Sequence, residues 1–364
     1  MAVDIYRRNV GDAHSRQSRV GLARGILGML VLAALGSVVH AAAAEPFRQL
    51  RATQSMQPRR DPPPPRVRFI KVERNVRLEV LDWGGSGRAV VFLAASGCTA
   101  HEFDDFAPKL TDHYHVYGIT RRGFGHSGFE AGEYGADLLG DDVLKVIDTL
   151  RLKRPVLVGH SFAGEELSSV ASRHPDRVAG VIYLEAAYPY AFENGRGMSM
   201  SEFQRVVQGP SPPAPGAGDR VSLRALQNYY RRIYGFTLPE SELRQEWVVL
   251  PSGRIQGRRR FPGSAILMKG TKEYRNIPAP ALIVFANPHA LGPWFERNRD
   301  PATAARIAAY SAELQAFTSR QQRAIENAVP SAHVIAIPGA NHFVFITNES
   351  EVLRYMHAFL STLP

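Results

Sequence analysis

The segment that most constrains the fold of this chain is residues 155–164, which read PVLVGHSFAG. Its apolar start predicts a short buried strand, and residues 165–173 predict a helix with one apolar face. Ser161 stands between the two elements, and small residues, Gly159 and Ala163, lie two positions away on either side. A strand, a sharp turn with a serine at its tip and a helix are typical of a nucleophile elbow. The segment therefore predicts a serine that is held exposed for chemistry.

The turn needs small neighbours, because the strand and the helix must close around a serine in a strained backbone conformation. Gly159 meets this need. Two residues after the serine, where such turns usually carry glycine, the chain has Ala163, and Gly164 follows one step later. The alternative is a serine that merely caps a helix, since serine is a common N-cap residue. The sequence around the segment has to decide between these two interpretations.

Predicted strands and helices alternate on both sides of this segment. Continuous apolar runs predict buried strands at 89–94, 178–184 and 281–286, because strands inside a parallel sheet are covered on both faces. Further strands are expected at 67–72, 76–83, 115–119 and 333–337, and helices at 103–110, 136–150 and 349–360. This order predicts an α/β fold in which a mostly parallel sheet carries helices on both faces.

A long insert separates the strand that ends at Leu184 from the next predicted strand. It is too long for a simple connection, and helices are expected within it at 223–234 and 240–247. We interpret residues 188–275 as an inserted cap over the carboxyl ends of the strands, where parallel sheets bind ligands. Its aromatic residues could line a pocket or merely pack, and they are Tyr188, Tyr190, Phe192, Phe203, Tyr229, Tyr230 and Trp247.

Residues 1–44 have the layout of a secretory signal peptide, with an arginine-rich start, an apolar run over 26–39 and small alanines before Glu45. An uncleaved membrane anchor is the alternative, because the apolar segment extended to residue 44 is long enough to span a bilayer. Residues 45–66 contain consecutive prolines and predict an extended linker. We therefore expect an exported protein, periplasmic or secreted, or one anchored through its N-terminal segment.

The net charge of +10 is concentrated in residues 1–66 and 188–275. No nucleic-acid-binding motif accompanies the basic run at 258–260, so we expect no nucleic-acid partner. The sequence has no metal-ligand cluster and no phosphate-binding loop, so we expect no metal and no cofactor. Cys98 is the only cysteine, which excludes an internal disulfide, and we interpret it as a packing residue rather than a catalytic thiol.

Four motifs occur in a fixed order along the chain. They are VVFLAASG at 90–97, RRGFGHS at 121–127, GHSFAG at 159–164 and PGANHF at 338–343. With these motifs in register, residues 67–364 resemble the alpha/beta-hydrolase family. The resemblance implies an oxyanion-hole strand and loop, the elbow, and a histidine loop after the last strand. It favours the nucleophile over the helix cap for Ser161.

The resemblance also implies the partners of Ser161. His342 is the expected base, because it follows the last strand, as the order of the family requires. The loop after residue 286, where the family usually carries its acid, offers no carboxylate. We therefore assign the acid to Glu185, at the end of the preceding predicted strand, a position that some family members use. Asn287 as a neutral orienting group is the fallback, and Glu296 is a later carboxylate.

The oxyanion hole is expected from two backbone N–H groups. One belongs to Phe162, the residue after the nucleophile, and the other to Ser96 in the loop after the oxyanion-hole strand. The usual histidine-glycine pair of the family aligns with Ala94 and Ala95. A backbone donor needs no particular side chain, so this departure is compatible with the assignment.

These residues predict a serine hydrolase that acts on a small-molecule substrate, with a carboxylic ester as the favoured class. Amide hydrolysis, cleavage of a carbon–carbon bond and cofactor-free haloperoxidase chemistry use the same parts within the family. A member of another class is the remaining alternative, namely a ligand-binding protein that keeps the fold without catalysis. The sequence specifies neither the oligomeric state nor the size of the acyl group.

Overall fold

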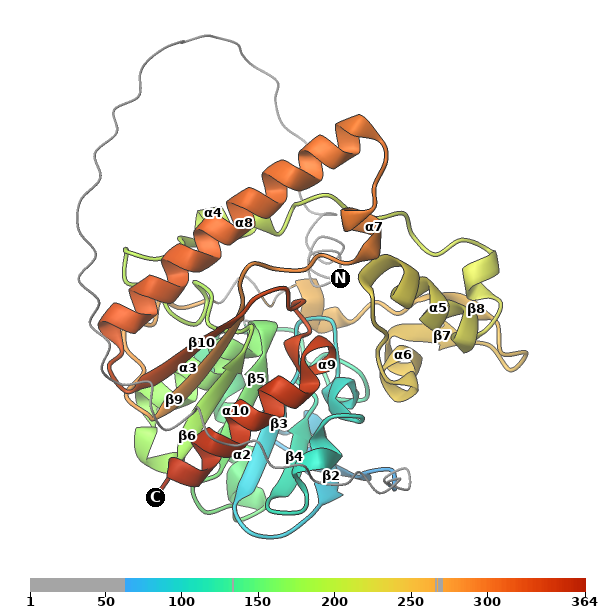
Figure 1. The fold of residues 1–364 in the computed structure, drawn as a ribbon. Coiled ribbons are helices and arrows are strands. Elements are labelled where there is room, and N and C mark those ends of the chain that lie inside the picture. The colour runs from blue at the N-terminus through green and yellow to red at the C-terminus, as the bar shows by residue number, and fades with distance from the viewer. Residues whose placement is uncertain (1–62, 133, 266, 268–270) are drawn as a thin grey trace, which may run out of the picture. The chain divides into compact units, whose positions relative to one another are not determined.

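The computed structural model describes residues 63–364, except residues 133, 266 and 268–270 (Figure 1). Its central feature is an eight-stranded sheet with the order β1-β2-β4-β3-β5-β6-β9-β10. The strands are β1 Arg66–Lys71, β2 Arg77–Gly84, β3 Ala89–Leu93, β4 His115–Ile119, β5 Val156–His160, β6 Gly180–Leu184, β9 Ala281–Ala286 and β10 Ala332–Ile337. β2 pairs antiparallel with β1 and β4, and every pair from β4 to β10 is parallel. The predicted, mostly parallel sheet is confirmed.

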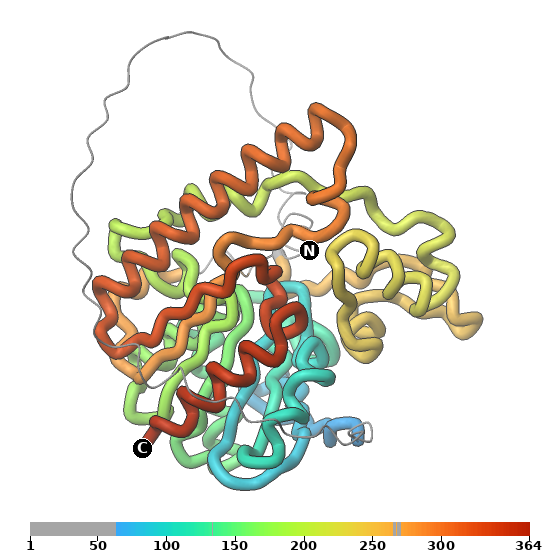
Figure 2. The backbone as a smooth tube through the Cα atoms, viewed as in Figure 1, coloured from blue at the N-terminus to red at the C-terminus, as the bar shows by residue number. Residues whose placement is uncertain are grey.

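The central strands are apolar along their whole length because both faces of the sheet are covered. In β6, Val181 and Tyr183 pack on one side of the sheet, whereas Ile182 and Leu184 pack on the other. The first face is covered by α2 (Ala136–Thr149) and α3 (Gly164–Arg173), and the second by α10 (Glu349–Thr362) (Figures 1 and 2). The predicted helices at 136–150, 165–173 and 349–360 are thereby confirmed to within about one turn.

The prediction of a single helix at 103–110 is wrong. Two short 3₁₀ helices stand there instead, η2 (Ala100–Phe103) and η3 (Ala107–Leu110). Pro108 explains the difference, because a proline inside a helix lacks the N–H for its hydrogen bond and clashes with the preceding turn. At the start of η3 the same proline is tolerated.

The segment between β6 and β9 contains α4 (Met200–Val206), α5 (Leu223–Tyr234), α6 (Glu240–Glu246) and a hairpin of β7 (Trp247–Val249) and β8 (Ile255–Arg258). The helices predicted at 223–234 and 240–247 are confirmed. α5 begins where the Ser222 side chain accepts a hydrogen bond from the Ala225 N–H. It ends at Gly235, whose φ of 85° is the left-handed conformation of a helix stop.

A helix that we did not predict, α8 (Pro301–Ala328), connects β9 to β10 after the short α7 (Pro293–Glu296). The Asp300 side chain caps its N-terminus by accepting from the Thr303 N–H, and Pro301 occupies its first turn. Tyr310, Leu314 and Phe317 follow one another at helical spacing on its buried face. α8 and α4 lie side by side over one end of the sheet (Figures 1 and 2). The short α9 (Val344–Thr347) completes the chain order before α10.

The N-terminal predictions fall outside the described residues. These are the signal peptide or anchor at 1–44 and nearly all of the linker at 45–66. Across residues 63–364, apart from the gaps named above, no helix combines the length and the apolarity needed to cross a membrane.

Candidate active site

The structure forms a sharp turn at Ser161, between the end of β5 and the start of α3. Ser161 has φ = 53°, a left-handed backbone conformation that residues other than glycine rarely adopt. Close packing holds it there. A Cβ on Gly164 would lie 1.8 Å from the Ala186 carbonyl oxygen, and one on Gly159 would lie 2.9 Å from Leu167. Gly164 and Gly159 therefore allow the helix to approach both neighbouring strands, while the methyl group of Ala163 is accommodated.

Glu185 occupies the corresponding position on the neighbouring strand. β5 and β6 are parallel, and His160 stands opposite Leu184, so the residues that follow these two leave the sheet at the same level. Glu185 also has a left-handed backbone, with φ = 52°, and it is fully buried. The two strands thus place a serine and a carboxylate side by side at the carboxyl edge of the sheet.

His342 reaches this edge from the loop after β10. Its Nδ1 lies 3.0 Å from Glu185 Oε2, so the ring donates a hydrogen bond to the carboxylate. In that tautomer Nε2 carries a lone pair, and among the described residues this buried atom has no hydrogen-bond partner. The structure therefore brings Glu185 and His342 into direct contact across 157 positions of the sequence.

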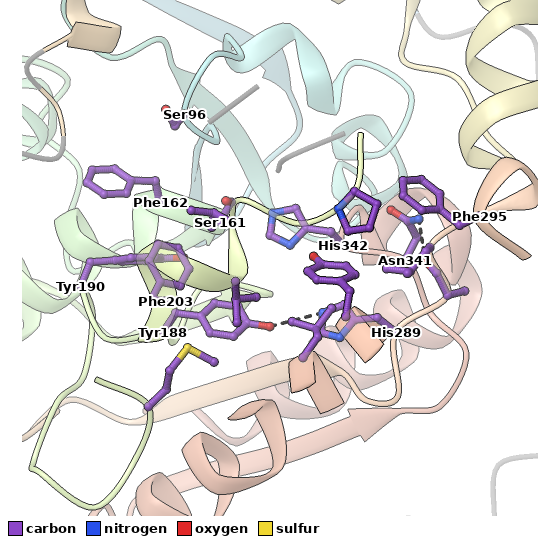
Figure 3. Close-up of a pocket in the computed structure, with 18 residues that line it drawn as sticks. Ser96, Ser161, Phe162, Tyr188, Tyr190, Phe203, His289, Phe295, Asn341 and His342 are labelled. Atoms are coloured by element: carbon purple, nitrogen blue, oxygen red, sulfur yellow. Dashed lines mark hydrogen bonds between the residues drawn. The ribbon is translucent and has the colours of Figure 1, made fainter. Parts of the chain in front are cut away.

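Ser161 and His342 line the same cavity, and Figure 3 shows both side chains at its wall. The residue before the serine fixes the position of the histidine loop. The His160 ring lies 4.9 Å from the His342 ring between centroids, and its Nε2 donates to the His342 carbonyl oxygen at 3.1 Å. Within the described residues no hydrogen bond joins Ser161 Oγ to His342 Nε2, so Nε2 is free to accept a proton.

The environment keeps His342 neutral and Glu185 charged. Burial lowers the pKa of His342 to about 4, the Glu185 hydrogen bond opposes that shift, and the nearby His160 adds to it. Burial by itself would raise the pKa of Glu185. The contacts with His289 and His342 outweigh burial and hold the pKa of this carboxyl well below its ordinary value. At neutral pH the pair is thus a carboxylate and a neutral imidazole that can accept a proton.

A second histidine shares the same carboxylate, and sequence reasoning did not assign it any role. His289 Nε2 lies 2.8 Å from Glu185 Oε2 and 3.3 Å from the Tyr188 hydroxyl. Tyr188 itself donates to Glu185 Oε2 at 3.0 Å, and the Ala286 N–H donates to Oε1 at 2.7 Å. Figure 3 shows His289 and Tyr188 meeting below the serine. The position of His289 directly after the strand end of β9 was the signal in the sequence that could have identified it.

The loop after β3 is fixed by ionic contacts on both sides. Its Ala95 N–H donates to the buried Glu102 carboxylate at 2.9 Å. Arg121 donates to the Ala94 carbonyl at 2.9 Å and forms a two-point ion pair with Glu166 of α3, at 2.8 and 2.6 Å. This arrangement ties the loop to the helix that follows the serine. Ser96 and Phe162, the expected oxyanion-hole residues, both line the cavity (Figure 3).

The alternative acids contact other parts of the fold. The Asn287 amide donates to Ser319 Oγ at 3.0 Å and to Gln322 Oε1 at 3.3 Å, both on α8. Glu296 accepts from the Gly292 N–H at 3.3 Å. Among the described residues, Glu185 is thus the carboxylate that contacts the His342 ring.

The sequence profile of the alpha/beta hydrolase family matches residues 90–354, which include all of these groups. The chain belongs to the alpha/beta hydrolase family. This membership agrees with the sheet order and with the family resemblance of the four sequence motifs.

Curated relatives of this alpha/beta hydrolase carry several activities in their names. A 2-(acetamidomethylene)succinate hydrolase of Mesorhizobium japonicum is 25% identical over 312 residues, covering 81% of this chain and 94% of the relative. A putative non-heme haloperoxidase of Mycobacterium phage D29 is 30% identical over 104 residues, covering 28% of this chain. That match spans only 37% of the phage protein.

Solved structures show the same fold. A crystal structure of E-2-(acetamidomethylene)succinate hydrolase aligns with a TM-score of 0.56 at 19% identity, covering 81% of this chain and 98% of the other. A carboxylesterase from Bacillus subtilis aligns with a TM-score of 0.54 at 13% identity, covering 82% and 93%. At such identities these similarities establish the architecture alone.

The cavity of this hydrolase encloses about 1000 Å³ of empty space, its opening to solvent included. One wall comes from the segment after β6 and from α4, and the opposite wall from the loop after β9 and from α8. The apolar lining residues are Phe162, Met198, Phe203, Val206, Val207, Pro210, Ala290, Leu291, Phe295 and Leu314. Tyr188, Tyr190, Tyr310, Ser96 and Asn341 complete it beside the serine and the histidines. Within the predicted cap at 188–275, the lining residues all lie before residue 211, and the unpredicted α8 contributes Tyr310 and Leu314.

The aromatic residues of the insert divide into two groups. Tyr188, Tyr190 and Phe203 line the cavity, and Phe162 packs on Tyr190 with 4.9 Å between ring centroids. The others are buried away from it and pack within the fold, and they are Phe192, Tyr229, Tyr230 and Trp247.

Cys98 belongs to a buried cluster at the contact between the loop after β3 and α6. Its ligand atom and those of Glu242 and Glu246 lie within 4.8 Å of one another, the geometry of a metal site. Arg258 pairs with Glu246 at 2.7 Å, however, and Glu242 accepts from the Thr99 N–H at 3.0 Å. Burial, followed by the charge of Glu102, raises the pKa of the Cys98 thiol well above its usual range. Arg258 offsets the charge of Glu246, while burial and the charges of Glu246 and Glu102 raise the pKa of Glu242 well above its ordinary value. The Cys98 thiol stays protonated and lies outside the cavity.

Glu165, in the first turn of the helix that follows Ser161, is a buried carboxyl group without a visible partner in the described part of the chain. Glu165 and Glu166 occupy the first turn of α3, where the helix dipole favours negative charge. Glu166 instead pairs with Arg121, and neither oxygen of the buried Glu165 has a hydrogen-bond partner in the described part of the chain. Burial, assisted by the neighbouring charge of Glu166, raises the pKa of Glu165 well above its ordinary value. This side chain therefore costs stability rather than adding it.

We expect Glu165→Leu to raise the free energy of unfolding by about 1–3 kcal/mol at neutral pH, because it removes an unpaired buried polar group. Because the folded protein keeps a proton that the unfolded chain releases, wild-type stability falls as the pH rises above the ordinary value of 4.5. Glu165→Gln, which cannot ionise, should match the wild type at about pH 4 and exceed it at about pH 8. Urea unfolding at both pH values measures the difference. Equal pH dependence of the wild type and the glutamine variant would contradict this account.

Proposed function

We propose that the protein is a serine hydrolase that cleaves carboxylic esters through an acyl-enzyme on Ser161. One observation carries the proposal. Glu185 holds His342 by Nδ1 at 3.0 Å, which leaves the free Nε2 at the wall of the cavity that also contains Ser161. A serine hydroxyl is a weak nucleophile by itself and needs an adjacent base of this kind. Membership of a hydrolase family and the order Ser161, Glu185, His342 along the chain support it further.

In the first half of the proposed reaction, His342 Nε2 takes the Ser161 hydroxyl proton as Oγ attacks the ester carbonyl carbon. The carbonyl oxygen becomes an oxyanion, which the N–H groups of Ser96 and Phe162 stabilise. The intermediate then collapses, the carbon–oxygen bond to the alcohol breaks, and the protonated His342 gives its proton to the departing alcohol. Glu185 stabilises the imidazolium while it exists and does not itself take the proton.

In the second half, His342 removes a proton from a water molecule, which attacks the acyl carbon. Collapse of the second oxyanion returns the proton to Ser161 Oγ and releases the carboxylic acid. The ties of Arg121 and Glu102 to the loop after β3 keep the expected donor at Ser96 in place. Such prearranged donors are worth roughly a hundredfold or more in rate each.

A fluorophosphonate probe tests the proposal, because it reacts covalently with serines that an adjacent base activates. The folded wild type should take up one probe molecule, and peptide mass spectrometry should locate it on Ser161. The Ser161→Ala variant is the matched control and should take up none. A folded wild type that remains unlabelled would support the other class of function, a ligand-binding protein that keeps the fold without catalysis.

Export remains part of this proposal. The predicted signal peptide would place the hydrolase in the periplasm or outside the cell, and an uncleaved segment would anchor it to the membrane. The mass of the mature protein measures this directly, since cleavage near Glu45 removes the leader.

A further inference from the structure

The described residues that line the cavity include no side chain with a fixed positive charge that could neutralise an anionic substrate. Among the described residues that line it, none is lysine, arginine, aspartate or glutamate. The polar side chains near the serine are already engaged, since the Asn341 amide donates to the Ala290 carbonyl at 2.8 Å and the Tyr188 hydroxyl donates to Glu185. Behind the His342 and His289 rings, the buried carboxylate of Glu185 carries a negative charge.

This wall discriminates against anionic substrates. A carboxylate that enters the cavity loses its water, finds no cation among the described lining residues and faces the charge of Glu185. Transfer of an apolar group from water into the cavity is favourable in free energy, because the group then contacts Phe203, Leu314 and other apolar side chains.

We propose that the substrates are uncharged esters with an apolar acyl group. This inference rests on the proposed ester hydrolysis and narrows it. It also separates this hydrolase from the 25% identical relative of Mesorhizobium japonicum, which is named for a succinate substrate.

Two esters of equal chain length test the inference, namely p-nitrophenyl hexanoate and the mono-p-nitrophenyl ester of adipic acid. They share the leaving group and differ at the far end of the acyl chain, which is a methyl group in one and a carboxylate in the other. We expect kcat/KM for the hexanoate to be higher by at least about a hundredfold. Release of p-nitrophenol measures both rates.

Leu314→Arg tests the same idea in reverse, because it adds a cation to the cavity wall. The ratio of kcat/KM for the hexanoate to kcat/KM for the adipate ester should fall by about tenfold or more in Leu314→Arg. Leu314→Met, of similar volume, should leave this ratio unchanged. Equal or faster cleavage of the adipate ester by the wild type would overturn the inference while leaving ester hydrolysis intact. Probe labelling of Ser161 without cleavage of the hexanoate would also overturn it. Absence of both labelling and cleavage would refute the proposed function itself.

Two histidines contact one and the same carboxylate oxygen of Glu185. Glu185 Oε2 accepts from His342 Nδ1 at 3.0 Å and from His289 Nε2 at 2.8 Å. The titratable groups around this oxygen come from three elements: Glu185 and Tyr188 at the end of β6, His289 after β9 and His342 after β10. His160 of β5 lies against the His342 ring. Each additional hydrogen bond to Oε2 weakens the electrostatic stabilisation that Glu185 gives to a protonated His342.

We infer that His289 is a positioning residue that limits how strongly Glu185 supports His342. Without the His289 donor at 2.8 Å, the Glu185 carboxylate would interact more strongly with the His342 ring. The pKa of His342 would then rise. His342 has a pKa of about 4 and must be neutral to act as a base, so the acid limb of wild-type kcat/KM is expected near that pH. Removal of the donor should move the limb to higher pH.

The test compares His289→Leu with His289→Gln, since glutamine keeps an N–H donor and leucine does not. The midpoint of the acid limb in the pH profile of kcat/KM should rise by about one pH unit in the leucine variant. It should stay near the wild-type value in the glutamine variant. A limb that is unchanged in the leucine variant, or that moves equally in both, would refute the role. If the leucine variant does not fold, NMR titration of the His342 ring in wild type and His289→Gln decides. Nearly equal pKa values are expected, and a value for the glutamine variant higher by a unit would overturn the inference.

Discussion

Ser161→Ala is expected to lower kcat for p-nitrophenyl hexanoate by roughly a million-fold, to the level of catalysis by the remaining groups. Alanine keeps the Cβ and the backbone of the elbow but removes the only atom that could form the acyl-enzyme. Steady-state and burst-phase measurements of p-nitrophenol release give the rate and show whether an acyl-enzyme accumulates.

The variant must stay folded for this result to carry weight. Packing around Gly159 and Gly164 holds the turn and is not changed by the loss of a hydroxyl, so the melting temperature should remain near that of the wild type. Turnover within tenfold of the wild type in a folded Ser161→Ala protein would remove this serine from the mechanism.

Glu185→Gln should lower kcat by about ten-thousandfold, the scale observed when the acid of a catalytic triad is replaced by its amide. Glu185 Oε1 accepts from the Ala286 N–H, so the amide NH₂ of glutamine would occupy the place of Oε2. It would then face the N–H groups of His342 and His289 and the Tyr188 hydroxyl, donor against donor. The His342 ring would have to move its proton to Nε2, where it can no longer act as a base.

Tyr188→Phe is the matched control for Glu185→Gln. It removes one donor to the carboxylate at 3.0 Å but leaves the charge and the His342 contact in place, so kcat should fall by no more than about tenfold. Near-wild-type kcat in Glu185→Gln, together with a large loss on substitution of Asn287 or Glu296, would transfer the acid role to the loop after β9.

The strands of this fold were predictable because burial on both faces leaves a direct trace in the sequence. β3, β6 and β9 are apolar from end to end, and no competing element explains such runs. The order of motifs around Ser161 and His342 then indicated the edge of the sheet where the side chains meet.

Features that depend on distant partners were not predictable in the same way. α8 is a different case, because Asp300 with Pro301 marks its start and Ile307, Tyr310 and Leu314 have helical spacing, so its local signals were present and were overlooked. The contact of His289 with Glu185 joins residues 104 positions apart, so the place of His289 after β9 indicates the edge of the sheet but not its partner. Glu165 would be placed at the surface by any propensity, and only the packing of α3 buries it.

The left-handed backbone at Ser161 and Glu185 has a consequence for laboratory evolution. Glycine adopts a φ of 53° without penalty, so a library screened only for survival at high temperature should enrich glycine at position 161. At position 185 the same change would leave the buried donors of His342, His289 and Tyr188 without their acceptor, so no enrichment is expected there. Each clone enriched at position 161 would gain heat tolerance by discarding the group that does the chemistry. Thermostabilisation of this enzyme therefore needs selection for turnover in every round, with Glu165 as the buried position where tolerance and turnover need not conflict.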